Sequence, residues 1–137
     1  MAQMTLEAVP ESLDRVLEFI DANLERSQFP AKVQVQINIA IEELFVNIAR
    51  YAYRPYVGEV TIRVETETAP SQATIRFIDR GRPYNPLQKE DPDVTLSAEE
   101  REIGGLGIYM VKQSMDEIYY EYQDGKNILT LKKRAEN

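Results

Sequence analysis

Residues 31–53 contain neither glycine nor proline, and this limits the possible folds more than any other stretch of the sequence. The stretch is long enough for a helix of about six turns. Between Val33 and Ile41, apolar residues alternate with polar or small ones, a pattern typical of a strand. From Ile37 onward, apolar residues also recur at helical spacing, as Ile41, Leu44, Phe45 and Ile48. This spacing and the length of the stretch favour a single long helix.

The rest of the chain divides into short elements separated by turn-forming residues. Its apolar patterns predict, in chain order, a strand at 2–8, a helix from Pro10 to Phe29, a hairpin with strands around 60–64 and 73–77, a helix at Gly107–Met115, and a hairpin of 117–123 with 126–132. Asp124-Gly125 in the second hairpin is a strong type I′ turn signal. This order predicts one domain over residues 1–137, an α+β two-layer sandwich whose mainly antiparallel, mixed sheet carries its helices on one face.

The stretch between the first hairpin and the glycine-led helix, residues 80–103, is predicted to be a polar loop with a short helix at Ala98–Arg101. Ordered loops of this length are uncommon unless they act as lids or binding loops.

Composition excludes several classes of function. The chain contains no cysteine and no histidine, which removes disulfides, thiolate metal sites and Ser-His or Cys-His nucleophile pairs. The net charge of −7 argues against direct nucleic-acid binding, because affinity for phosphate backbones comes mainly from clustered Lys and Arg. The sequence has neither an apolar run of about 18 residues nor a recognisable signal peptide. We therefore expect a cytoplasmic protein that does not contact a membrane.

Glu43 and Asn47 are four residues apart on the predicted long helix, so both side chains project from one face. The amide oxygen of Asn47 is a suitable ligand for Mg²⁺, and a carboxylate one turn away can take a proton from an attacking hydroxyl or water. Arg50, on the following turn, can reach a phosphate, but an ordinary surface arginine fits this position equally well. The pair also fits an ordinary solvated helix face, so this pattern alone leaves both interpretations open.

A second motif, Asp79-Arg80-Gly81-Arg82-Pro83, directly follows a predicted strand. An ionised Asp79 only accepts hydrogen bonds and suits the exocyclic amine of adenine. Gly81 removes a side chain where a base must approach, and Pro83 stiffens the exit from the strand. Asp, Gly and Pro are also the usual residues of polar turns, so the motif is weak by itself.

A third motif, Gly104-Gly105-Leu106-Gly107, leads into a helix. Backbone N–H groups at a helix start are unpaired, and the helix macrodipole favours an anion there. A flexible loop before a helix would also explain the glycines. The motif is neither a P-loop nor a dinucleotide fingerprint, because it lacks a Gly-Lys-Ser/Thr ending and a surrounding βαβ unit. The occurrence of all three motifs in this order by chance is much less probable than the occurrence of any single one.

Together the motifs resemble those of the GHKL ATPases and kinases, which share the Bergerat fold. Glu43-x-x-x-Asn47 is similar to their N box, Asp79-x-Gly81-x-Pro83 to the first glycine box and Gly105-Leu106-Gly107 to the second. Within this superfamily, the small size resembles the stand-alone bacterial anti-sigma-factor serine/threonine kinases. Further similarities to that group are the runs Pro83-Tyr84-Asn85-Pro86, Gly104 to Lys112, and Met115-Asp116-Glu117.

The resemblance implies a site for ATP and Mg²⁺, in a pocket closed by a mobile lid between Asn85 and Gly104. It implies that Asn47 holds Mg²⁺ and that Glu43 acts as the base. Asp79 would bind the adenine amine, and Gly81 would border the base. Gly105 and Gly107 would meet the phosphates.

The function that the resemblance implies is that of a protein-serine/threonine kinase acting as an anti-sigma factor. Such kinases phosphorylate a STAS-domain anti-sigma antagonist, bind a sigma factor and commonly form homodimers. Two alternatives stay open: a non-catalytic ATP-binding regulatory module, and a histidine-kinase catalytic domain acting in trans. The second is less attractive, because no dimerisation and phosphoacceptor segment precedes residue 11.

Overall fold

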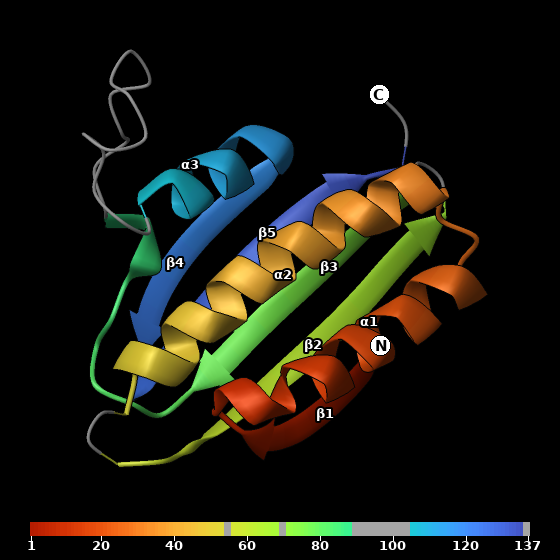
Figure 1. Cartoon of the computed structure of the whole chain (residues 1–137). Helices are drawn as coiled ribbons and strands as arrows, with labels where there is room; N and C mark the ends of the chain where they lie inside the picture. Colours follow the sequence, from red (N-terminus) through yellow and green to blue (C-terminus); the bar gives the residue numbers. More distant parts are fainter. Residues whose placement is uncertain (54–55, 69–70, 89–104, 136–137) are drawn as a thin grey trace.

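The computed structural model describes residues 1–53, 56–68, 71–88 and 105–135. Its strands and longer helices follow the predicted order, which is strand, two helices, hairpin, helix and hairpin. Along the chain in Figure 1 they are β1 (Ala2–Glu7), η1 (Pro10–Ser12), α1 (Leu13–Arg26), α2 (Ala31–Tyr51), β2 (Glu59–Thr68), β3 (Ser71–Asp79), η2 (Pro86–Gln88), α3 (Gly105–Ser114), β4 (Glu117–Gln123) and β5 (Lys126–Arg134).

The five strands form one sheet in the order β1-β2-β3-β5-β4. The expected mainly antiparallel sheet is confirmed. The expected mixed character is not found in the described strands, whose four pairs are all antiparallel. Asp124 and Gly125 have φ angles of 54° and 76°, the left-handed conformation that a type I′ turn requires. Strand β5 returns to pair with β3, which places Asn127 directly opposite Asp79.

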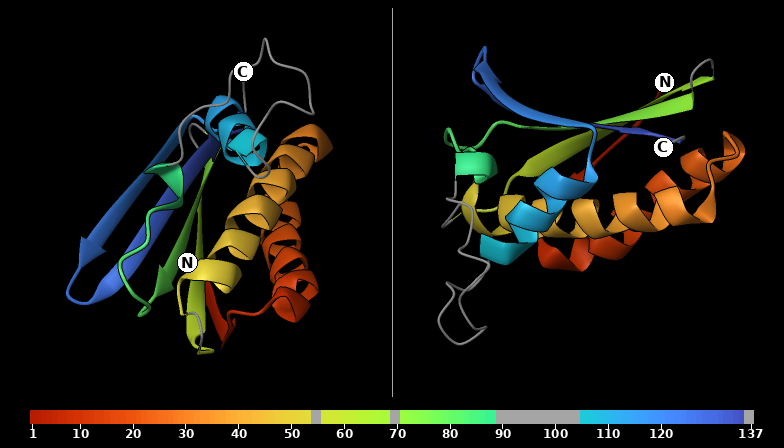
Figure 2. Two further views of the ribbon diagram at one scale, coloured as in Figure 1. Left: turned by 60° about the vertical axis from the view of Figure 1, so that its left-hand side comes forward. Right: turned by 90° about the horizontal axis from the view of Figure 1, so that it is seen from above.

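The molecule has two layers, with α1, α2 and α3 all on one face of the sheet (Figure 2). Helix α2 lies between α1 and α3 and packs against both. The core between the layers combines inward-facing strand residues, such as Ile62, Ile75 and Leu131, with the apolar stripes of α1 and α2. The predicted α+β two-layer sandwich is therefore confirmed.

Helix α2 resolves the ambiguous pattern at its start. Val33, Ile37 and Ile41 are buried, whereas Val35 and Ile39 are 55% and 57% exposed. The buried residues recur every four positions, so one helical stripe accounts for the packing and the alternation does not produce a strand.

The structure refines the predicted elements at two places. Helix α3 begins at Gly105 rather than Gly107, so the glycines themselves form its first turn. The short helix η2 follows Asn85 and was not anticipated. The predicted helix at Ala98–Arg101 and most of the proposed lid lie outside the described residues. No helix within the described ranges combines the length and apolar character needed to cross a membrane.

Candidate functional site

The three motifs meet at one edge of the molecule, on the left-hand side of Figure 1. The C-terminal half of α2, the end of β3, the start of β5 and the start of α3 come together there. A continuous series of contacts joins the motifs: Gly107 to Glu43, Glu43 to Asn47, Asn47 to Tyr84, Tyr84 to Asn127, and Asn127 to Asp79. Residues far apart in the sequence thus form one connected site.

Glu43 and Asn47 share a face of α2, as their spacing predicts. The Asn47 amide donates to the backbone oxygen of Glu43 at 2.7 Å and to its carboxylate at 3.2 Å. Asn47 is buried and Glu43 is half-buried, so this is not a solvated helix face. Arg50 lies exposed on the last turn of the same helix.

Gly107 is in direct contact with Glu43. A Cβ atom added at Gly107 would lie 2.4–2.6 Å from the carboxylate atoms of Glu43. This close approach needs a residue without a side chain, and it brings the first turn of α3 against the carboxylate. The first backbone N–H groups of a helix lack intrahelical partners, so Gly105, Leu106 and Gly107 present donors at this edge. Gly104 lies outside the described residues.

Asp79 ends β3 on the helix-facing side and is only 4% exposed. Its Oδ1 accepts hydrogen bonds from the Gly81 N–H at 2.9 Å and from the Asn127 amide at 2.8 Å. Burial raises the pKa of Asp79 above that of an ordinary aspartate, although the two donated hydrogen bonds lower it again in part. Asp79 is therefore a buried, directed acceptor rather than part of a solvated turn.

The residues after Asp79 pack against the C-terminal end of α2. A Cβ atom at Gly81 would lie 2.2 Å from the backbone oxygen of Ala52, so this glycine permits a close approach of two backbones. The Arg82 N–H donates to the same oxygen at 3.0 Å, and its guanidinium donates to the Tyr51 oxygen at 3.0 Å. Arg82 thus caps carbonyl groups that the helix end leaves unpaired. Pro83 is exposed at the surface beside it.

Tyr84 lies between the first two motifs, a position for which the sequence indicated no role. Its ring contacts the Tyr51 ring with centroids 5.5 Å apart, and its hydroxyl donates to the Asn47 oxygen over a long 3.4 Å. Burial, with smaller contributions from Tyr51 and Glu43, raises the pKa of Tyr84 to about 12. The hydroxyl therefore remains a neutral donor toward Asn47 at physiological pH.

Asn127 is the principal residue of the site that lies outside the three motifs. It is 3% exposed and forms hydrogen bonds with Asp79, with the backbone oxygen of Arg82 and with Tyr120. A signal was present in the sequence, because Asn127 precedes Leu129 and Leu131 at the inward-facing positions of an alternating strand. A polar residue at such a position needs a buried hydrogen-bond partner.

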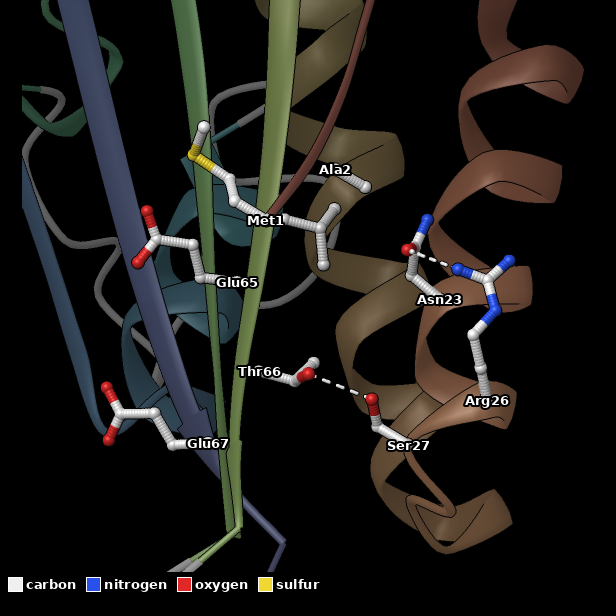
Figure 3. Close-up of a pocket in the computed structure, with 9 residues that line it drawn as sticks. Met1, Ala2, Asn23, Arg26, Ser27, Glu65, Thr66 and Glu67 are labelled. Atoms are coloured by element: carbon white, nitrogen blue, oxygen red, sulfur yellow. Dashed lines mark hydrogen bonds between the residues drawn. The ribbon is translucent and has the colours of Figure 1, made fainter.

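Several hollows occur at the surface, and two of them are lined by motif residues. One, of about 470 Å³, is lined by Asp79 and Arg80 together with Tyr53, Gly58 and Glu59 among others. The other, of about 330 Å³, is lined by Glu43 and Gly107 together with Ile39, Glu42 and Met110. Figure 3 shows another, of about 370 Å³, between the end of α1 and strand β2. There Ser27 and Thr66 share a hydrogen bond of 2.8 Å, and the Arg26 guanidinium donates to Asn23. None of the motif residues lines the hollow drawn in Figure 3, so that hollow does not belong to the site.

Asn47 is the candidate ligand for a divalent ion that the motifs predict. The described part of the chain contains no group of three or more acidic, His or Cys side chains able to hold a metal. Asn47 supplies one hard oxygen, and Mg²⁺ in proteins is usually bound by few protein oxygens together with water and substrate phosphates. The residues present therefore fit Mg²⁺ that arrives with a nucleotide.

The chain belongs to the histidine kinase-like ATPase domain family, whose sequence profile matches residues 6–133. It is 24% identical over 106 residues to the serine/threonine-protein kinase BtrW of Bordetella bronchiseptica, covering 77% of this chain and 74% of BtrW. It is 30% identical over 103 residues to the serine-protein kinase RsbW of Bacillus cereus, covering 70% of this chain and 61% of RsbW. The resemblance inferred from the motifs is thus confirmed.

Solved structures show the same fold. The chain resembles the histidine kinase domain of the blue-light activated kinase EL346 from Erythrobacter litoralis, with a TM-score of 0.55 and 18% identity over 90% of this chain and 59% of that one. The Acinetobacter baumannii histidine kinase AdeS matches with a TM-score of 0.50 and 14% identity, covering 100% of this chain and 70% of that one. At these identities the likeness concerns the architecture.

Proposed function

We propose that this protein binds ATP with Mg²⁺ at the connected site and transfers the γ-phosphoryl group to a serine or threonine of a partner protein. The observation that carries this proposal is the packing of Gly107 against the Glu43 carboxylate. It joins a candidate general base to a helix start with free N–H groups, the two features that phosphoryl transfer requires side by side. The relatives named as serine and serine/threonine kinases support the same reaction class.

Each part of the nucleotide has a matching group in the site. Asp79 accepts the exocyclic amine of adenine, with Gly81 and Pro83 in the backbone segment beside the base. The N–H groups of Gly105, Leu106 and Gly107, with Gly104 before them, receive phosphate oxygens. Asn47 contributes an oxygen to Mg²⁺, and Arg50, exposed on the last turn of α2, is the side chain proposed to approach a phosphate. Bound Mg²⁺ neutralises charge on the phosphates during transfer.

Glu43 is the proposed general base. Its carboxylate accepts the Asn47 amide at 3.2 Å, which restrains its orientation on α2. It also touches the first turn of α3, where the phosphates would lie. From this position it takes the proton of the attacking hydroxyl, a contribution that is typically worth about 10²–10⁴ in rate.

The partner of this reaction, in our proposal, is a STAS-domain anti-sigma antagonist. The protein would act in the cytoplasm as an anti-sigma factor, as a homodimer that binds a sigma factor. Support for this narrower role comes from the motif resemblance to anti-sigma kinases and from the similarity to RsbW and BtrW.

The test is phosphate transfer from labelled ATP–Mg²⁺ to purified STAS-domain proteins from the same genome. Wild type should label one of them, and Glu43→Gln should bind ATP but label it roughly 10²–10⁴ times more slowly. Glu18→Gln is the matched control, because Glu18 is an exposed helical glutamate on α1, outside the site. Equal rates for wild type and Glu43→Gln would remove Glu43 as the base. ATP binding without transfer to any such protein would favour a non-catalytic ATP-binding module instead.

A further inference from the structure

Asn127 forms hydrogen bonds through both the nitrogen and the oxygen of its side-chain amide. It lies directly opposite Asp79 in the pairing of β3 with β5. Its amide nitrogen donates to the Asp79 Oδ1 and to the Arg82 backbone oxygen, both at 2.8 Å, with the Gly81 oxygen further away at 3.5 Å. Its amide oxygen accepts the Tyr84 N–H at 3.1 Å and the Tyr120 hydroxyl.

These partners fix the orientation of the amide. Arg82 offers a carbonyl oxygen and Tyr84 an N–H group, so only one of the two flipped arrangements satisfies both. Reversing the amide would set oxygen against oxygen and donor against donor. Because Asn127 is only 3% exposed, water cannot readily relieve such a mismatch. The side chain therefore always directs its NH₂ group, and never its oxygen, toward Asp79.

The consequence for Asp79 is that its two carboxylate oxygens are not equivalent. Oδ1 is occupied by the Gly81 N–H at 2.9 Å and by the Asn127 amide. Among the described residues, no hydrogen bond reaches Oδ2. The carboxylate thus presents one defined oxygen, purely as an acceptor, while the other is tied to the protein.

We propose that Asn127 is a positioning residue that fixes Asp79 for recognition of a 6-amino purine and against a 6-oxo purine. The inference rests on the nucleotide site proposed above. An acceptor oxygen pairs with the N6 amine of adenine but opposes the O6 oxygen of hypoxanthine or guanine. A protonated or freely rotating carboxyl group would discriminate less, because it can also donate.

Asn127 acts on the protonation of Asp79 as well as on its direction. Burial raises the pKa of Asp79, and the hydrogen bonds from Asn127 and Gly81 counteract that rise. Removing the Asn127 donor therefore raises the pKa further. A protonated Asp79 loses its match to the adenine amine, so ATP affinity in such a variant should begin to fall at a higher pH than in the wild type.

The experiment measures ATP and ITP binding by calorimetry across a pH series. ITP carries hypoxanthine, which has the 6-oxo group but no 2-amino group. Asn127→Leu removes the donation at similar volume and should weaken ATP binding about tenfold. It should also reduce the preference for ATP over ITP. The acid limb of ATP binding, which is the fall in ATP affinity as the pH is lowered, should move to higher pH. Tyr120→Phe is the control, because it removes only a partner of the amide oxygen and leaves the donation to Asp79 in place.

A purely structural role predicts a different result. Asn127→Leu would then melt at a lower temperature, but its folded fraction would keep the wild-type ATP-over-ITP ratio and acid limb, which would overturn the proposal. Should Asn127→Leu fail to fold, Asn127→Ser carries the same comparison, since it shortens the donor without adding an apolar group. An unchanged ratio and limb in Asn127→Ser would then overturn it. Failure of the wild type to bind either nucleotide would instead refute the proposed function.

Discussion

Gly81 and Gly107 both lack room for a side chain, but the atoms that fill the space differ. A Cβ atom at Gly81 would lie 2.2 Å from the backbone oxygen of Ala52, which also accepts the Arg82 N–H at 3.0 Å. Both groups in this contact are backbone, so no side chain can rotate away to make room. Gly81→Ala must therefore separate the end of α2 from the end of β3. Overpacking costs about 1–3 kcal/mol, and the lost hydrogen bond adds about 1 kcal/mol. For a domain of this size, 2–4 kcal/mol corresponds to a melting temperature lower by about 7–14 °C.

At Gly107 the nearest atoms belong to the end of a flexible side chain, the Glu43 carboxylate. Gly107→Ala should therefore displace the carboxylate and leave the backbone in place, while alanine favours the helix by up to about 1 kcal/mol. Thermal unfolding followed by circular dichroism should show little or no loss of stability. The proposed phosphotransfer should slow, because the base has moved. Equal destabilisation by both substitutions, or normal transfer by Gly107→Ala, would refute this reasoning.

Two further predictions concern stability. Gly125 has φ of 76° and nothing near the position of an added Cβ, so Gly125→Ala should cost about 1 kcal/mol through backbone strain alone, measured by urea unfolding. Because burial raises the pKa of Asp79, ionised Asp79 lowers the free energy of unfolding at pH values above that raised pKa. This loss of stability diminishes as the pH falls through the raised pKa and the carboxyl group becomes protonated. The stability of Asp79→Asn relative to wild type should therefore be greatest near neutral pH and decline toward pH 4; a constant difference would contradict the assignment.

The fold was predictable because its signals are local. Helical stripes, alternating strands and the Asp124-Gly125 turn each act over a few residues, and the structure confirms the elements that they indicate. The start of α2 was ambiguous because alternation and helical spacing coincide there. Only burial against the sheet separates Ile37, which is packed, from Ile39, which is exposed. The short helix η2 also has a local signal, because Asn85 caps its start and Pro86 is its first residue; the Leu87 N–H donates to the Asn85 Oδ1 at 2.9 Å.

The site was predictable where a motif lies within one element. Glu43 and Asn47 share a helix face through their spacing alone. The contacts that give the site its shape are long-range and could not be derived in this way. Gly81 meets Ala52 only because β3 ends beside α2, and Asn127 meets Asp79 only through the register of β5 on β3. These depend on the assembled sheet rather than on any single segment.

The most direct test of the nucleotide site is calorimetry of ATP–Mg²⁺ binding to wild type and Asp79→Asn. Because Oδ1 of Asp79 is tied to the Gly81 N–H and the Asn127 amide, an asparagine must keep its oxygen there and turn its NH₂ group toward the base. That exchanges an acceptor for a donor facing the adenine amine. Losing a charge-assisted hydrogen bond costs about 1.5–3 kcal/mol, so ATP affinity should fall at least tenfold while the fold is retained. Unchanged ATP affinity in Asp79→Asn would contradict the placement of adenine at this site.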